Sequence, residues 1–88
     1  MNSHTLPDFW KQYNSLPESI QKKADKAYSI WCKYPHCNSL HFKRVSKTRP
    51  VYSVRIDDAY RALGLLIEDT VTWFWIGDHD EYMKMLKK

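Results

Sequence analysis

The stretch from Val51 to Tyr82 limits the possible folds most, because it reads as three consecutive strands joined by short acidic turns. In residues 51–57, VYSVRID, every second residue from Tyr52 to Ile56 is apolar. This two-residue period is typical of a strand covered on one face, and it places Arg55 on the opposite, open face.

Two further runs continue the pattern. Aspartates at 57–58 favour a turn through side-chain to backbone hydrogen bonds, and residues 60–67 follow with Arg61 as their only charge. Residues 71–76, VTWFWI, are β-branched or aromatic at every position, and Gly77 ends the run. The sequence therefore predicts an antiparallel meander.

Trp73 and Trp75 lie two residues apart in the last of these runs, so a regular strand would place both on one face. We interpret them as core or partner-binding residues rather than as a stacking platform for nucleobases.

The first half of the chain is predicted to supply helices that cover the meander. Pro7 and Asp8 suit the first turn of a helix over residues 6–14, and apolar residues recur at helical spacing over residues 17–33. Residues 41–45, HFKRV, are expected to form a further strand ahead of the meander.

The C-terminal segment DHDEYMKMLKK is expected to form a short helix with Asp78 as its N-cap. We therefore predict one α+β domain over residues 1–88, with two N-terminal helices packed on an antiparallel meander of about four strands and a short C-terminal helix. The expected core includes Trp10, Ile20, Tyr28, Trp31, Tyr52, Val54 and Ile56.

The composition of the chain limits the classes of partner, cofactor and location that fit it. A net charge of +4 and a pI near 9.1 favour an anionic partner. Cys32 and Cys37 are the only cysteines and lack the second pair of a zinc site, so we expect reduced thiols, no metal and no cofactor. No apolar run approaches the roughly 20 residues of a membrane span, which predicts a cytoplasmic protein without a membrane partner.

The order of the elements and several short motifs together resemble the RelE/ParE superfamily of bacterial type II toxins over nearly the whole chain. The motifs are LP before a basic amphipathic helix, LHFKR, VYSVRI, YRALG and WFWIGDHDEYMKML. The resemblance implies a cognate antitoxin as partner, in a toxin–antitoxin hetero-oligomer. RelE-like members of the superfamily cleave mRNA, either on the ribosome or free, whereas ParE-like members inhibit DNA gyrase without cleaving RNA.

Metal-free RNA cleavage needs a base for the 2′-hydroxyl proton, cations around the phosphorane and a proton for the leaving oxygen. His79 is the predicted proton-transfer group, because an imidazole titrates near neutrality, and Tyr82 three residues on is its predicted helper. Arg55 and Arg61 match the basic strand positions of the superfamily and are expected to hold the phosphate.

The remaining basic candidates for RNA or phosphate binding are Lys43, Arg44 and His41, and the sequence does not decide which of the first two faces the site. These residues favour an mRNA endoribonuclease that inhibits translation. A gyrase inhibitor, or a degenerate toxin that only binds its antitoxin, is the alternative. The acidic residues around His79 argue against dependence on the ribosome.

Overall fold

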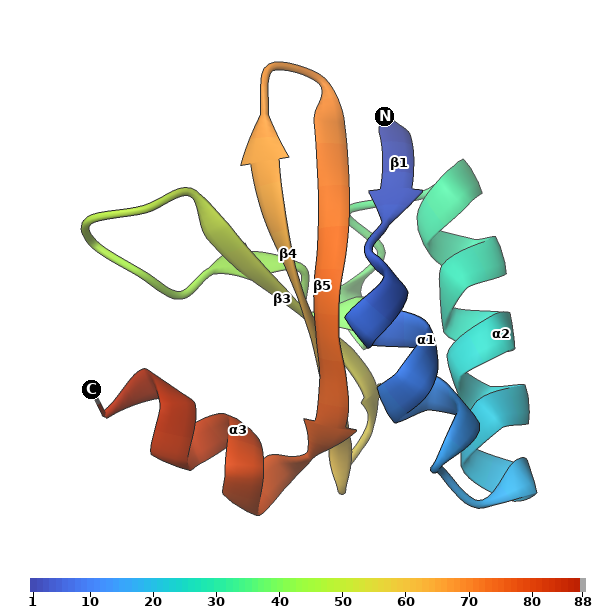
Figure 1. The fold of residues 1–88 in the computed structure, drawn as a ribbon. Coiled ribbons are helices and arrows are strands. Elements are labelled where there is room, and N and C mark those ends of the chain that lie inside the picture. The colour runs from blue at the N-terminus through green and yellow to red at the C-terminus, as the bar shows by residue number, and fades with distance from the viewer. Residues whose placement is uncertain (88) are drawn as a thin grey trace.

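The computed structural model describes residues 1–87, which form one five-stranded sheet with helices on both of its faces (Figure 1). The strands lie in the order β1-β5-β4-β3-β2. The elements are β1 (Asn2–Thr5), α1 (Pro7–Asn14), α2 (Glu18–Lys33), the 3-10 helix η1 (Asn38–Leu40), β2 (Lys43–Arg44), β3 (Val51–Asp57), β4 (Tyr60–Ile67), β5 (Thr70–Asp78) and α3 (His79–Leu86). In this described part, no helix combines the length and apolar character that crossing a membrane requires.

The predicted α+β class, both N-terminal helices, the meander and the C-terminal helix are confirmed. The strand expected over residues 41–45 is shorter, because only Lys43 and Arg44 pair with β3. His41 precedes it with a φ of 46°, in the left-handed region, so the chain turns there rather than running extended.

The sheet contains one strand that the sequence did not predict. β1 pairs with β5 in parallel, so the sheet is mixed rather than a purely antiparallel meander. Backbone hydrogen bonds extend this pairing, from Asn2 N–H to Asp69 O at 2.8 Å and from Leu6 N–H to Trp73 O at 3.0 Å. The segment NSHT is short, mostly exposed and without apolar alternation, so it carried no strand signal.

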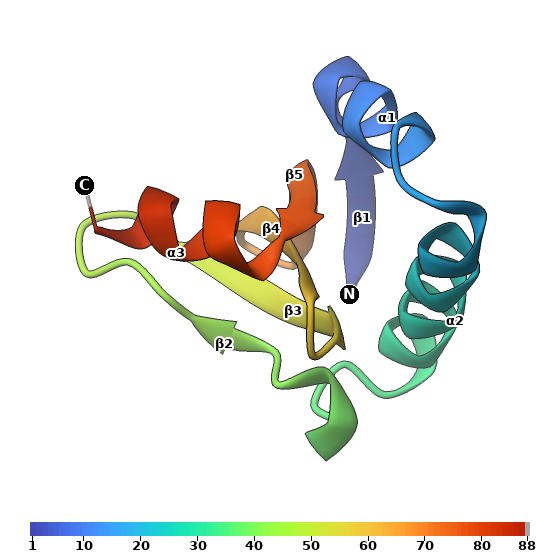
Figure 2. The ribbon, with the colours of Figure 1, turned by 90° about the horizontal axis from the view of Figure 1, so that it is seen from below.

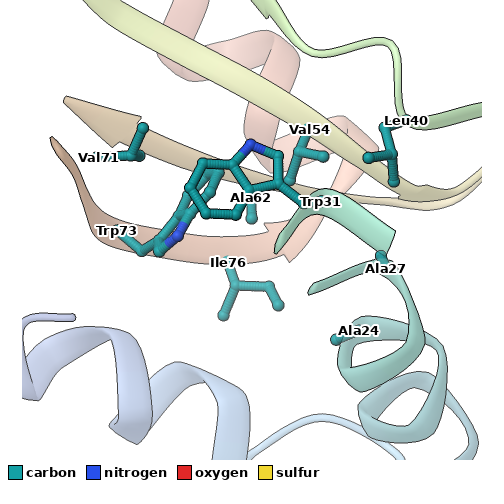
Figure 3. Close-up of a cluster of buried hydrophobic side chains, with 9 residues drawn as sticks. All are labelled: Ala24, Ala27, Trp31, Leu40, Val54, Ala62, Val71, Trp73 and Ile76. Atoms are coloured by element: carbon teal, nitrogen blue, oxygen red, sulfur yellow. The ribbon is translucent and has the colours of Figure 1, made fainter. Parts of the chain in front are cut away.

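The main core lies between the sheet and the pair α1 and α2 (Figure 3). Trp31 of α2 is only 1% exposed, and its ring packs edge-on against Trp73 of β5 with centroids 5.4 Å apart. Such edge-to-face contacts suit the charge distribution of aromatic rings. The buried residues of this core are Ala24, Ala27, Trp31, Leu40, Val54, Ala62, Val71, Trp73 and Ile76.

A register shift in β5 separates the two tryptophans that were expected on one face. Leu63 pairs with Trp75, but Gly64 pairs with Trp73, so Phe74 is the extra residue of a β-bulge. Trp73 therefore joins the main core and Trp75 joins a second cluster on the other face. The prediction of a shared face was wrong, because the bulge interrupts the alternation.

The second face is covered as well, by α3 (Figure 2). Tyr82 of α3 packs on Leu63 and Trp75, with Val51 and Met85 at the margin of the cluster. Ser53, which lies on this face, is consequently only 2% exposed. The face that carries Arg55 is therefore open to solvent only outside the area that α3 covers.

Two residues predicted to be buried lie at the surface. Trp10 and Tyr28 are 46% and 47% exposed. Each turns its polar atom to the missed strand: Trp10 Nε1 donates to Thr5 Oγ1 at 2.8 Å, and the Tyr28 and Ser3 hydroxyls hydrogen-bond at 2.6 Å. Aromatic residues with a polar tip suit such boundary positions. Of the other predicted core residues, Ile20, Trp31 and Val54 are buried, whereas Tyr52 and Ile56 are half-buried.

Gly64 generates a prediction about stability. A Cβ atom at this position would lie 2.5 Å from Val71 Cγ1 and 2.8 Å from Trp73 Cε3, both in side chains of the packed core. We expect Gly64→Ala to lower the free energy of unfolding by about 2 kcal/mol through overpacking, measured by chemical denaturation.

A double-mutant cycle with Val71→Ala provides the control, because removing Cγ1 relieves the nearest contact. The double variant should lose less stability than the sum of the two single losses. Strict additivity, or a change below about 0.5 kcal/mol in Gly64→Ala, would contradict this explanation.

Candidate functional site

Arg55 and Arg61 lie directly opposite each other on β3 and β4. Antiparallel partners share a face of the sheet, so the two side chains leave the sheet on the same side, which is the α3 side. Arg61 also pairs with Gly77 on β5, so Arg55, Arg61 and Gly77 form one row across three strands, the arginine row. The two arginines therefore lie side by side on one face of the sheet.

The start of α3 places His79 next to this row. β5 runs directly into α3, and the Asp78 carboxylate caps the helix by accepting a hydrogen bond from Glu81 N–H at 2.9 Å. His79 N–H donates to Ala59 O in the β3–β4 turn at 2.7 Å, which fixes the first helical residue against that turn. The predicted cap is confirmed, and the half-buried imidazole sits at the rim of the sheet.

Tyr82 connects the imidazole to the arginine row. Its ring centroid lies 5.7 Å from that of His79 and 6.0 Å from Arg61 Cζ, a cation–π distance. Its hydroxyl donates to Ser53 Oγ at 3.2 Å, and the residue is only 5% exposed. The ring is therefore held on three sides, which suits an orienting role better than exchange of protons with solvent.

The β3–β4 turn holds both guanidinium groups. Arg61 Nη1 donates to the carbonyl oxygens of Asp57 and Tyr60, the latter at 2.9 Å. Arg55 Nη2 donates to Asp58 Oδ1 at 2.5 Å, and this hydrogen bond lowers the pKa of the Asp58 carboxyl. The Asp58 side chain is 98% exposed, so this ion pair lies at the solvent-facing side of the turn.

Asp57 anchors the same turn to α2. Burial of its carboxylate favours the neutral form, but hydrogen bonds from Ala59 N–H and from Lys23 Nζ outweigh that effect and lower its pKa. The distances are 2.8 Å and 3.1 Å, respectively. The turn is thus fixed from both sides of the sheet.

The structure separates the three remaining basic candidates. Lys43 pairs with Ser53 and so lies on the same face as Arg55 and Tyr82. Arg44 pairs with Tyr52 on the opposite face, and its Nε donates to Ser46 O at 2.8 Å. His41 is exposed, and no side-chain hydrogen bond within residues 1–87 joins it to the arginine row.

Two polar residues of this site were missed by sequence reasoning. Ser53 was recognisable as the one small polar residue in VYSVRI on the Arg55 face, where a neighbouring hydroxyl would need a partner. Asp58 was interpreted only as a turn residue. Residues three apart, such as Arg55 and Asp58, lie on opposite faces of a regular strand, so the sequence did not indicate an ion pair. The pair forms because the chain reverses direction at the turn.

Residues 18–84 match the model of the ParE-like toxin domain family. A search of curated proteins finds no match to the sequence.

Solved structures share the fold at low identity. A chain of the RelB–RelE antitoxin–toxin complex from Methanococcus jannaschii is 16% identical with a TM-score of 0.74, and the match covers 93% of this chain and 96% of that one. YafQ from E. coli strain BL21(DE3) is 7% identical with a TM-score of 0.74, over 92% and 96% of the chains. The YoeB/ParE toxin from Agrobacterium tumefaciens is 12% identical with a TM-score of 0.69, over 90% and 99%.

The Arg55–Asp58 ion pair can be tested by titrating the Asp58 carboxyl. Arg55→Gln removes the donor, so the pKa of Asp58 should rise toward about 3.9, the ordinary value for an aspartate. The folded-state pKa in the wild type lies below that value. Any stabilisation from the pair is therefore present above it and lost as the pH falls through the folded pKa. Carboxyl carbon shifts followed by NMR titration measure the change.

Arg49→Gln makes the same substitution in the exposed β2–β3 loop and should leave the Asp58 titration unchanged. An Asp58 pKa that is equal in the wild type and in Arg55→Gln would show that the pair does not persist in solution.

Proposed function

Because the chain belongs to the ParE-like toxin domain family, within the RelE/ParE superfamily of type II toxins, we propose that it is an endoribonuclease that cleaves mRNA and inhibits translation. The observation that carries this proposal is the gathering of His79, Tyr82 and Arg61 beside Arg55 on one face of the sheet. A titratable imidazole next to paired guanidinium groups is the combination that metal-free cleavage requires.

In this mechanism, His79 removes the proton from the 2′-hydroxyl, and the resulting oxygen attacks the adjacent phosphorus. The bond to the 5′-oxygen breaks, and that oxygen takes a proton from solvent as a cyclic phosphate forms. Arg61 and Arg55 stabilise the negative charge of the phosphorane, since charge-assisted hydrogen bonds from planar guanidinium groups match phosphate oxygens. Tyr82 orients the imidazole and is a positioning residue.

Among the basic residues outside the cluster, Lys43 is the best placed to bind a neighbouring RNA phosphate, because it shares the face of Arg55. Arg44 and His41 would contact RNA only if the strand continued around the β2 edge. Cleavage at the proposed site does not require the predicted RNA-binding role of Arg44 and His41.

The partners of this proposal are a cognate antitoxin, which would form a hetero-oligomer with the toxin, and mRNA, either free or on the ribosome. The antitoxin is supported by family membership, and one structure of the same fold is described as an antitoxin–toxin complex. Cleavage of free RNA and of RNA in translating ribosomes, compared in one assay, decides whether the ribosome is required.

A second candidate is inhibition of DNA gyrase without RNA cleavage. Two observations favour it: the matching family model is ParE-like, and hydrogen bonds within the chain already engage both arginines. Expression in cells separates the candidates, since a nuclease stops protein synthesis first whereas a gyrase inhibitor first changes plasmid supercoiling.

We expect His79→Ala to lower the rate of RNA cleavage by a factor on the order of 10² to 10⁴, the range for loss of a positioned acid or base. Folding should be retained, because the imidazole makes no side-chain hydrogen bond within residues 1–87. Gel analysis of a labelled RNA measures the rate, and circular dichroism measures the stability.

His36→Ala is the matched control, because His36 is exposed and its ring lies against Phe42, outside the cluster. It should cleave at the wild-type rate. If His79→Ala cleaves as fast as His36→Ala, His79 is not the proton-transfer group, and the gyrase candidate gains.

Binding of RNA should weaken with salt, since phosphate contacts release counterions. Loss of one contact in Arg55→Gln should reduce the slope of log K against log salt by about 0.7 for a single strand. Lys11→Gln, on α1 beyond the opposite face, should leave the slope unchanged. Equal slopes in all three proteins would remove Arg55 from the RNA-binding surface.

A further inference from the structure

We propose that the cavity between the helical pair and the sheet is a binding site for a compact, uncharged aromatic molecule of one or two rings. The cavity has a volume of about 230 Å³ and lies on the opposite face of the sheet from the arginine row. The proposal is independent of RNA cleavage.

The floor of the cavity is apolar. Val54 and Ala62, which are partners on β3 and β4, form it together with Trp73 and Ile76 of β5. Because the cavity opens to solvent at its mouth, its apolar floor contacts water in the free protein. A ligand that covers the floor removes this apolar surface from water, which favours binding.

Small residues create the space. Three of the four alanines in the chain, Ala24, Ala27 and Ala62, line the cavity, on the α2 wall and on the floor. Each is at most 7% exposed, so each takes a core position where a larger apolar side chain would close the gap. Large aromatic rings surround these alanines rather than filling the space between them.

The mouth favours a small molecule over a protein segment. Tyr13 of α1 donates to Asp25 Oδ1 of α2 at 2.7 Å, and Tyr28 of α2 bonds Ser3 of β1 at 2.6 Å. These two hydrogen bonds tie α1 to α2 and α2 to β1 across the opening. A helix or strand would have to break both, whereas a molecule the size of an aromatic ring system passes between side chains.

The lining indicates the class of ligand. Six aromatic side chains from α1, α2 and β5 contribute to the walls, which favours stacking and edge contacts with another ring. Among residues 1–87, Asp25 is the only carboxylate that lines the cavity, and it lies at the exposed mouth. A charged group on the floor would be buried without a partner, so the ligand is uncharged. An apolar cavity of about 150 Å³ accommodates benzene, so this larger one accommodates a bicyclic ring.

Indole is the test molecule. Titrated into the ¹⁵N-labelled protein, it should shift the amide signals of Val54, Ala62 and Trp73 in a saturable manner at submillimolar to millimolar concentration. At ten times the dissociation constant it should raise the melting temperature by about 6 to 11 °C, because it binds the folded state alone.

Ala27→Leu fills the cavity and should abolish these shifts, while Ala59→Leu makes the same change on the exposed β3–β4 turn and should bind indole as the wild type does. If Ala27→Leu does not fold, Ala27→Val adds less volume and should weaken binding at least tenfold. Unsaturable shifts in the wild type, or equal indole binding in the filled variant, would overturn the proposal.

Discussion

The bulge at Phe74 is the constraint on which the rest of the structure depends. It lets a single strand send Trp73 to one core and Trp75 to the other, so β5 supplies the main aromatic contact to both layers of helices. Gly64 stands opposite the bulge because no Cβ fits against Trp73 there. A regular β5 would have placed both indole rings on one face and left the other face without its tryptophan.

The two faces that result have different chemical characters. The face under α1 and α2 is apolar and carries a cavity, whereas the face under α3 ends in paired arginines and an imidazole. Neighbouring residues of the same strands serve both: Val54 and Ala62 form the floor of the cavity, and Arg55 and Arg61 point the other way. A change of strand register would therefore disturb both sites together.

The sequence predicted those helices and strands whose positions are determined by local patterns. Alternation located β3 and β4 at their observed bounds, helical spacing located α2, and the capping residue located α3. It did not predict β1, which has no apolar pattern and forms only because β5 offers an edge. It also failed at Trp10 and Tyr28, whose exposure depends on hydrogen bonds to that same strand. For the site, alternation placed Arg55 on the open face, but the position of Arg61 opposite it and the contacts of the Asp57-Asp58 turn required the folded hairpin.

The parallel pairing of β1 with β5 determines when the β-sheet is completed during folding. Residues 2–5 are synthesised well before their partners, residues 70–73. Contacts between such distant parts of a chain form late, after the local hairpins and helices. A nascent chain would therefore carry β1 unpaired until β5 has been synthesised. The β1–β5 pairing would then be among the last contacts made, so the sheet is completed only after residues 70–73 are available.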